Sequence, residues 1–538
     1  MYLRANITSK SIETQGFKSV DGLEVFIAGY IMWENKLYWG FEFQEILIAH
    51  YKTNSIDKNI NNYNGIFYFI ITKKTQVTVG IDRYGFYPLM YKQNSNEIFI
   101  SNSSNNLINK KFEWNEPALI EYLSFGFTFS DKTIIKDIHE FKPHRIYTIN
   151  FEKDHIDINE NSYWRLILKL DSISKKESDK TLKELINYQF DIYSDFIREN
   201  GNKIIMPISG GLDSRFLMNE FDKRDVNSML ITFGGNKDNY DLKRGIELGL
   251  LTKNSIGHFF HVNSQKLLDT IIELPSPSNR ITTAQFNELY LYSAKRFNTE
   301  IPLFISGQSG GFLTGGHMGL RMKKWSKKDD VITYIMRHKT SPFTSKLTSE
   351  HKNTLYKAID EVIPNDVSYI NMLYLWEVEH RQRKMMARYS FFEGDQTIIK
   401  VLMPFYNYNL IDFFTRLRFD ELLNQKFFIR CMKDFIYLNN EEMLKIKRVD
   451  KTIRKVRNHY MSEYLPKLSA KIKTMLIMQG ERKHFVDSNY PWKAKIDPQN
   501  IPAIIKPYLS EKLGTTQNFA MFQLNKFVEQ EKLKKSSN

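Results

Sequence analysis

The chain has 538 residues, a formal net charge of +15 and a single cysteine, Cys431. Its length exceeds what one hydrophobic core can organise, so we expect two or more domains. The lone cysteine excludes an internal disulfide framework and a cysteine-rich zinc site. No apolar stretch is as long as a membrane span and the first residues lack a signal-peptide pattern, so we expect a cytoplasmic protein without membrane contact.

The positive charge raises the question of a nucleic-acid partner, because Lys and Arg neutralise phosphates. The basic residues are spread along the chain, and the richest segment, KIKRVDKTIRKVR at 445–457, comes without a recognisable RNA-binding signature. We interpret the charge as solvated surface with affinity for an anionic substrate, and we do not expect a nucleic-acid partner.

The first 165 residues alternate β-prone runs with turns rich in Asn, Gly and Asp. Helical spacing appears there only briefly, at 116–126. This part of the chain is therefore predicted to consist mainly of β-sheet. The strongest predicted strands cover residues 23–33, 65–73, 75–81, 96–102 and 144–150.

From residue 176 the pattern changes to strands that alternate with helices, which is typical of a parallel α/β sheet. Ligands bind at the carboxyl ends of such strands, so the loops that follow them are the candidate site. Beyond residue 320 the sequence is mostly helical. The predicted helices cover 176–200 and 240–251, and the predicted strands 204–208, 227–235, 258–262 and 302–307.

The most informative stretch reads KIIMPISGGLDS at 203–214, an apolar strand that ends in a Gly-Gly turn before a helix. Glycines let backbone N–H groups approach a ligand, and the helix N-terminus favours an anion. Ser209 and Ser214 can donate hydroxyls to phosphate, whereas Asp213 favours a Mg²⁺ between its carboxylate and the phosphates. The alternative is an ordinary Gly-Gly turn. We expect Ser209, Gly210, Gly211, Asp213 and Ser214 to bind a nucleotide.

A second Gly-rich turn, SGQSGGFLTGGH at 306–317, follows another predicted strand of the same sheet. Because the carboxyl ends of parallel strands share one edge, both turns are placed to touch one nucleotide. The further expected contacts are Ser306, Gly307 and Gln308 in this turn and Thr232 and Phe233 at the end of the strand at 227–235.

With these motifs in this order, the chain resembles the asparagine synthetase family, including its β-lactam synthetases and lasso peptide cyclases. The resemblance implies an Ntn-like antiparallel β sandwich over 1–165, of the glutaminase type, and an ATP-pyrophosphatase domain over 166–538 that uses ATP and Mg²⁺. It rests on segments similar to family motifs at 64–91, 116–149, 209–214, 306–317 and 403–414.

The chain departs from the family pattern at the glutaminase nucleophile. Relatives use a cysteine exposed at the mature N-terminus, whereas here Met1 is followed by Tyr2 and Cys431 lies in the other domain. Without a thiolate there is no route to the thioester that glutamine hydrolysis needs. We therefore expect no glutaminase activity and a structural or interaction role for the N-terminal domain.

Two further departures concern the ATP site. Gly311 and Phe312 occupy the positions of the family's acidic pair, and Gln308 the position of a usual Glu, so Asp213 is the one carboxylate left for the metal. The family also implies a late catalytic lysine that stabilises the departing pyrophosphate. Lys447 and Lys451 are both candidates, and their spacing does not choose between them.

Residues 377–388, EVEHRQRKMMAR, place charged side chains on overlapping faces of a predicted helix. Glu377, Arg381 and Arg388, with Lys384 nearby, are candidate ligands for an anionic substrate or pyrophosphate through forked hydrogen bonds. A set of surface ion pairs is the alternative. His317 and His380 have no metal-ligand partners at useful spacing and are interpreted as structural.

The leading hypothesis is an ATP-dependent ligase that joins a small-molecule or peptide carboxylate to an amine through an acyl-adenylate, with Asp213 and one of the two lysines as catalytic residues. The main alternative is a catalytically silent relative that binds a nucleotide or a partner. A nucleic-acid-modifying enzyme is a third reading, disfavoured by the whole-chain resemblance. A homodimer remains open.

Overall fold

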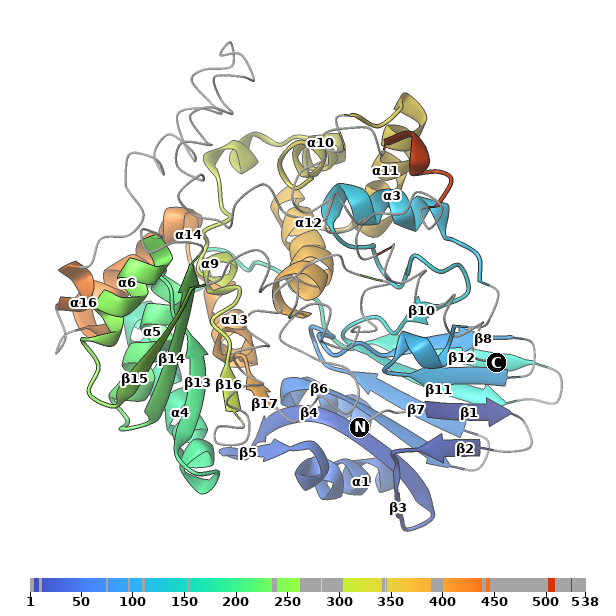
Figure 1. Cartoon of the computed structure of the whole chain (residues 1–538), viewed down its shortest axis with the longest axis horizontal. Helices are drawn as coiled ribbons and strands as arrows, with labels where there is room; N and C mark the ends of the chain where they lie inside the picture. Colours follow the sequence, from blue (N-terminus) through green and yellow to red (C-terminus); the bar gives the residue numbers. More distant parts are fainter. Residues whose placement is uncertain are drawn as a thin grey trace.

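The computed structural model describes the greater part of the chain, in two β-rich regions followed by helices (Figure 1). Lys447 and Lys451 fall outside the described residues. No helix within the described segments is long and apolar enough to cross a membrane. The described residues are 4–8, 12–73, 76–94, 97–108, 112–151, 155–234, 240–261, 282, 303–340, 344, 346–388, 400–437, 442–445, 502–508 and 524.

The larger N-terminal sheet is antiparallel, in the order β12-β11-β7-β6-β4-β3, with β5 paired to β4. A two-residue turn joins β4 to β5, and both of its residues, Glu34 and Asn35, have positive φ, as tight hairpins require. The strands are β3 (Lys18–Val20), β4 (Leu23–Trp33), β5 (Lys36–Trp39), β6 (Asn64–Lys73), β7 (Gln76–Ile81), β11 (Arg145–Phe151) and β12 (Ile156–Ser162).

A second antiparallel sheet, in the order β10-β8-β9-β1-β2, packs on the first. One buried cluster joins Tyr68 and Ile70 of β6 to Ile98 and Ile100 of the second sheet, which makes the pair of sheets a sandwich. The strands of this second sheet are β1 (Arg4–Thr8), β2 (Ile12–Gln15), β8 (Met90–Gln93), β9 (Glu97–Ser101) and β10 (His139–Glu140).

Strand β6 is apolar along most of its length because both of its faces are covered. Phe67, Phe69 and Ile71 point away from the second sheet and pack with Leu47 and Ile48 of helix α1 (Gln44–Lys52). A strand covered on both sides reads as a continuous apolar run instead of an alternating one.

The C-terminal sheet is parallel, in the order β15-β14-β13-β16-β17. The predicted antiparallel and parallel sheets are thus confirmed, and so is the mainly helical region that follows. Strand β17 was not predicted. The sheet and the helices near it are β13 (Lys203–Pro207), β14 (Asn227–Gly234), β15 (Ser255–His261), β16 (Leu303–Ile305), β17 (Lys400–Leu402), α4 (Lys175–Glu199), α5 (Leu212–Asp222) and α6 (Tyr240–Gly249).

Helix α12 (Tyr369–Trp376) continues directly into a π-helix, η7 (Glu377–Ala387). In Figure 1 α12 lies between the parallel sheet and the N-terminal sandwich. π-Helices are rare and frequently occur at functional sites. The other helices used below are α3 (Glu116–Phe125), α9 (Gly310–Leu313), α10 (Lys328–His338), α11 (Ser349–Val362), α13 (Tyr408–Phe414), α15 (Lys426–Cys431) and α16 (Glu442–Lys445).

Candidate active site

A pocket of about 260 Å³ opens where β13 and β16 end, and both Gly-rich turns line it. The carboxyl ends of parallel strands are the usual binding edge of such a sheet. The structure therefore brings together two turns that lie almost a hundred residues apart in sequence. The lining residues are Pro207, Ile208, Ser209, Gly211, Asp213, Ser214, Ser306, Gly307, Gln308, Ser309, Gly311, Phe312, His317, Arg381, Gln382 and Met386.

The first turn is fixed by hydrogen bonds from its own backbone N–H groups to its two serine hydroxyls. The Ser209 N–H donates to Ser214 Oγ at 3.2 Å, and the Gly211 N–H donates to Ser209 Oγ at the same distance. Gly211 is the N-cap of α5, so the positive end of that helix faces the pocket. Arg215 holds the turn from behind by donating to the Gly210 carbonyl at 3.3 Å and to the Met443 carbonyl of α16.

The two turns are joined through Asp213. Its Oδ2 accepts the Gly311 N–H at 2.8 Å. A Cβ built on Gly311 would lie 3.7 Å from the same oxygen. A side chain at position 311 would therefore start beside the Asp213 carboxylate, which is where a second metal-binding carboxylate would have to stand.

Ser309 adopts a left-handed conformation, with φ of 66°, in the middle of the second turn. Such a conformation costs a non-glycine residue roughly 1–2 kcal/mol. Its hydroxyl is held on both sides, because it donates to Gln382 Oε1 at 2.6 Å and accepts from the Tyr406 hydroxyl. Strained residues of this kind cluster at functional sites.

Behind the pocket wall lies a buried carboxylate, Glu377, that gathers positive charge. Lys339 is ion-paired with this carboxylate. Glu377 Oε2 lies 3.3 Å from Arg381 Nη1 and 3.4 Å from His317 Nδ1. Burial alone would raise the pKa of Glu377, but Lys339, His317 and Arg381 together hold it well below its usual range. The carboxylate is therefore ionised, and it orients the two basic residues that line the pocket.

Burial lowers the pKa of His317, and Glu377 beside it acts in the opposite direction. Its Nδ1 is buried and lies 3.4 Å from Glu377 Oε2, and the residue is one of those that line the pocket. The sequence interpretation of His317 as structural stays a prediction.

Among the residues that the structure describes, Asp213 is the one carboxylate that lines the pocket. Glu377 is paired with Lys339, Arg381 and His317. No group of three or more His, Cys, Asp or Glu side chains suited to a metal occurs in the described segments. Mg²⁺ commonly uses one or two carboxylates and completes its coordination with waters and phosphate oxygens. The donor set therefore fits a metal carried by phosphate and contacted by Asp213.

The remaining predicted nucleotide contacts lie in different places. Gly210 does not itself line the pocket, but Ser209 and Gly211 on either side of it do. Thr232 is buried and does not line the pocket. It lies against α6 instead, since a Cβ on Gly245 of that helix would come within 2.9 Å of the Thr232 methyl group. The Phe233 side chain, like Lys447 and Lys451, lies outside the described parts, so these three assignments stay predictions.

Arg388 requires a correction. It does not line the pocket but is buried against the N-terminal sandwich, where it pairs with Glu140 and donates to the Gly85 carbonyl at 3.2 Å. Eleven residues make about three turns of an α-helix, which would put residues 377 and 388 on one face. The wider turns of η7 rotate Arg388 to another side, because π-helical bonds run from i to i+5. Glu377 and Arg381 remain together.

Sequence reasoning also missed Ser309, Gln382 and Met386. Ser309 had a signal, because it occupies a position where the family motif has glycine and glycine readily accepts positive φ. Gln382 and Met386 gave none, because neither belongs to a motif that the sequence marks.

Comparison with known proteins gives one family match. Residues 42–164 match the glutamine amidotransferase domain. This segment covers α1 and the strands from β6 to β12, and it contains no residue of the pocket. Part of the N-terminal sandwich is therefore similar to an amidotransferase domain. No curated protein matches the chain.

Solved structures give distant likenesses. The allosteric regulatory enzyme of purine biosynthesis is 8% identical over 56% of this chain and 81% of its own, with a TM-score of 0.21. Glutamine phosphoribosylpyrophosphate amidotransferase from B. subtilis, complexed with ADP and GMP, is 9% identical over 43% and 74%, with a TM-score of 0.18. NMN synthetase from Francisella tularensis is 14% identical over 40% and 97%, with a TM-score of 0.21. TM-scores of this size carry no functional weight.

Proposed function

We propose that this protein is an ATP-dependent ligase that forms an amide bond through an acyl-adenylate and has no glutaminase activity. One observation carries the proposal: two Gly-rich turns, the N-terminus of α5, Asp213 and Arg381 converge on one pocket at the carboxyl edge of a parallel sheet. The resemblance to asparagine synthetases in the order of the motifs supports the same reaction class.

In the proposed reaction a carboxylate oxygen of the substrate attacks the α-phosphorus of ATP, and the bond to the β-phosphate breaks to release pyrophosphate. An amine then attacks the acyl carbon, and the carbon–oxygen bond to AMP breaks. Mg²⁺, when bound with the triphosphate, neutralises phosphate charge beside Asp213. The substrates are a small-molecule or peptide carboxylate and an amine.

The residues of the pocket divide this work. The turn amides and the serine hydroxyls hold phosphate oxygens, and Arg381 binds an anionic group with its guanidinium fork. His317, which lines the pocket, accepts the proton that the attacking amine loses. The absence of glutaminase activity is proposed because Cys431, the single cysteine of the sequence, is buried in α15, far along the chain from the amidotransferase-like segment.

Calorimetry with ATP and an assay of pyrophosphate release with candidate carboxylates test the proposal. With Mg²⁺ present, Asp213→Asn and Arg381→Met should each weaken ATP or pyrophosphate binding roughly tenfold or more. The first variant removes a carboxylate from the metal, and the second removes charge-assisted hydrogen bonds that contribute about 1.5–3 kcal/mol. Asp366→Asn is the matched control, because that carboxylate is exposed and pairs with Arg165 outside the pocket. Glutamine should yield no glutamate above a boiled control. Equal ATP affinity in all three variants would refute the site.

The second candidate function is a silent relative that binds a nucleotide without reaction. Gly311 and Phe312 favour it, because they replace the acidic pair of the family. If wild type and Gly311→Asp both bind ATP yet release no pyrophosphate with any carboxylate tested, this candidate replaces the ligase.

A further inference from the structure

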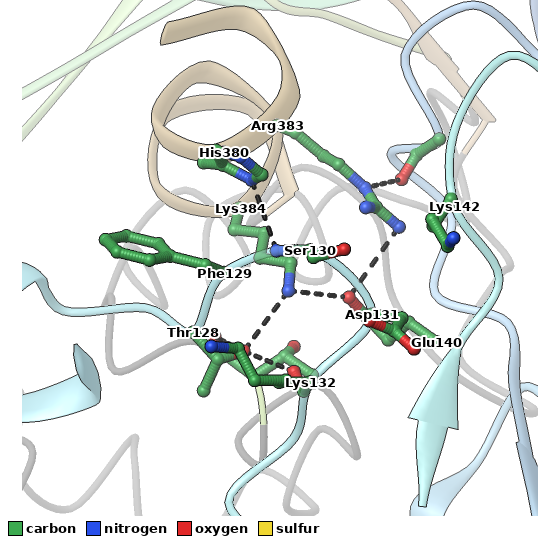
Figure 2. A network of polar contacts seen from close by, with 12 residues as sticks. Thr128, Phe129, Ser130, Asp131, Lys132, Glu140, Lys142, His380, Arg383 and Lys384 are labelled. Atoms are coloured by element: carbon green, nitrogen blue, oxygen red, sulfur yellow. Dashed lines mark hydrogen bonds and ion pairs between the residues drawn. The ribbon is translucent and has the colours of Figure 1, made fainter. Parts of the chain in front are cut away.

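The π-helix η7 is held from one side by the N-terminal sandwich. Figure 2 shows His380, Arg383 and Lys384 reaching from the helix onto the loop at 128–132 and onto Glu140. The Ser130 N–H donates to His380 Nδ1 at 3.3 Å, and Lys384 Nζ donates to Thr128 Oγ1 at 3.1 Å. These contacts join segments about 250 residues apart.

Glu140 is the centre of this contact. Its carboxylate is fully buried and lies 3.0 Å from Lys384 Nζ and 3.6 Å from Arg383 Nη2, and it also pairs with Arg388. Arg383 further donates to the Gly85 and Phe141 carbonyls at 3.0 and 2.9 Å. One sandwich carboxylate therefore compensates three buried cations that η7 and its C-cap supply.

The other side of the same helix forms the pocket wall. Arg381 and Gln382 line the pocket, and Gln382 also donates to Glu377 Oε2 at 3.0 Å. Arg383 and Lys384, which follow directly, face the sandwich. A shift of η7 along or about its axis would therefore move Arg381 and Gln382 together with the cations that Glu140 holds.

We propose that Glu140 is a positioning residue for the pocket: by fixing η7, the N-terminal sandwich sets where Arg381 and Gln382 stand beside the Gly-rich turns. Removing a partner from a buried ion cluster leaves uncompensated charge, which a helix relieves by moving toward water. What the pocket binds rests on the proposed function, whereas the link between sandwich and helix does not.

The test compares Glu140→Gln with Glu220→Gln in the full chain. Glu220 is an equally buried carboxylate of α5, but it accepts hydrogen bonds from Asn219, Lys223 and Arg224 and not from η7. Amide hydrogen exchange of peptides covering 377–388 reports the helix, and calorimetry with ATP reports the pocket. Urea unfolding reports global stability.

We expect Glu140→Gln to speed exchange in 377–388 and to weaken ATP binding roughly two- to thirtyfold, the usual range for coupling between sites. Glu220→Gln should do neither, and Glu140→Asp should restore part of both effects. Should Glu140→Gln fail to fold, the comparison runs between Glu140→Asp and Glu220→Asp. Unchanged exchange in 377–388 for the Glu140 variant overturns the proposal. If wild type binds no ATP, the proposed function fails while the exchange result still decides the coupling.

Discussion

Two adjacent glycines, Gly310 and Gly311, make a matched pair for testing the geometry around Asp213. A Cβ on Gly310 would lie 2.5 Å from Asp213 Cγ and 2.8 Å from Phe405 Cζ, whereas on Gly311 its nearest neighbour would be 3.7 Å away. Phe405 is wedged between Phe216 and Phe428 and has little room to move. Alanine should therefore be tolerated at 311 and not at 310.

The magnitudes follow from two opposing effects. Replacing a helical glycine by alanine gains about 0.5–1 kcal/mol, and forcing extra atoms into a packed site costs about 1–3 kcal/mol. We expect Gly311→Ala to be neutral or slightly stabilising and Gly310→Ala to lower the free energy of unfolding by about 1–2 kcal/mol. Because Gly310→Ala displaces the Asp213 carboxylate, it should also weaken magnesium-dependent ATP binding.

Gly311→Asp extends the comparison to the metal. A carboxylate there would stand about 5 Å from that of Asp213, a repulsion of up to roughly 3 kcal/mol at an effective dielectric constant of about 20. Without metal the variant should be less stable than Gly311→Ala, and added Mg²⁺ should raise its melting temperature more than that of wild type. Urea unfolding and thermal melting across a magnesium titration measure both effects. Equal stability of the two alanine variants would refute this geometry. So would a melting temperature of Gly311→Asp that does not change when Mg²⁺ is added.

Three further predictions test other parts of the structure. Ser309→Gly should be about 1 kcal/mol more stable than Ser309→Ala in urea unfolding, because both lose the hydroxyl contacts but only alanine keeps the strain of positive φ. The reverse order of stability would count against strain at this turn. Burial raises the pKa of the Cys431 thiol to about 12, so the native protein should not react with a thiol reagent at pH 8 and should react on unfolding; rapid native labelling would contradict the burial. Burial would raise the pKa of Glu140, but Arg388, Lys384 and Arg383 lower it to about 2. The ionised carboxylate therefore stabilises the folded protein fully above a pH of about 4.5, and this stabilisation is lost as the pH falls through about 2. The stability difference between wild type and Glu140→Gln should shrink over that range, and a constant difference would oppose it.

Much of the fold was predictable because the residue pattern of its longer helices and strands is visible in the local sequence. The predicted strand at 23–33 coincides with β4, and the predicted helix at 176–200 is α4 shifted by one residue. Both are long and strongly patterned. Strand β17 was missed because its three residues form no strand pattern in the sequence, and its pairing with β16 defines it as a strand. Short elements of this kind are defined by tertiary contact and not by sequence pattern.

The site was predictable where function is carried by neighbouring residues and not where it depends on helix register. The SGGLDS turn gathers its contacts within six residues, so its sequence is enough to locate it. The segment 377–388 contains the right residue types, but the assumption of α-helical spacing put Arg388 on the wrong side. A π-helix has no simple sequence signature. Here its register is accompanied by tertiary contacts of Glu140 with Arg383, Lys384 and Arg388.

Gly311 and Phe312, which the resemblance to asparagine synthetases aligns with two acidic residues, differ in their surroundings, and this bears on what a substitution at each position would do. Position 311 opens onto the pocket beside Asp213, with no atom closer than 3.7 Å to a built Cβ. Phe312 is 5% exposed, and its ring centroid lies 5.5 Å from that of His317 and 5.1 Å from that of Tyr374. A carboxylate at 312 would be buried beside the histidine that Glu377 already contacts, and it would compete with Glu377 for the same cations. The aromatic residue at 312 thus fits the Glu377 cluster, which orients Arg381 toward the pocket. Aspartate at 311 would therefore add a carboxylate beside Asp213 alone, whereas glutamate at 312 would also disturb the ion pairs of Glu377.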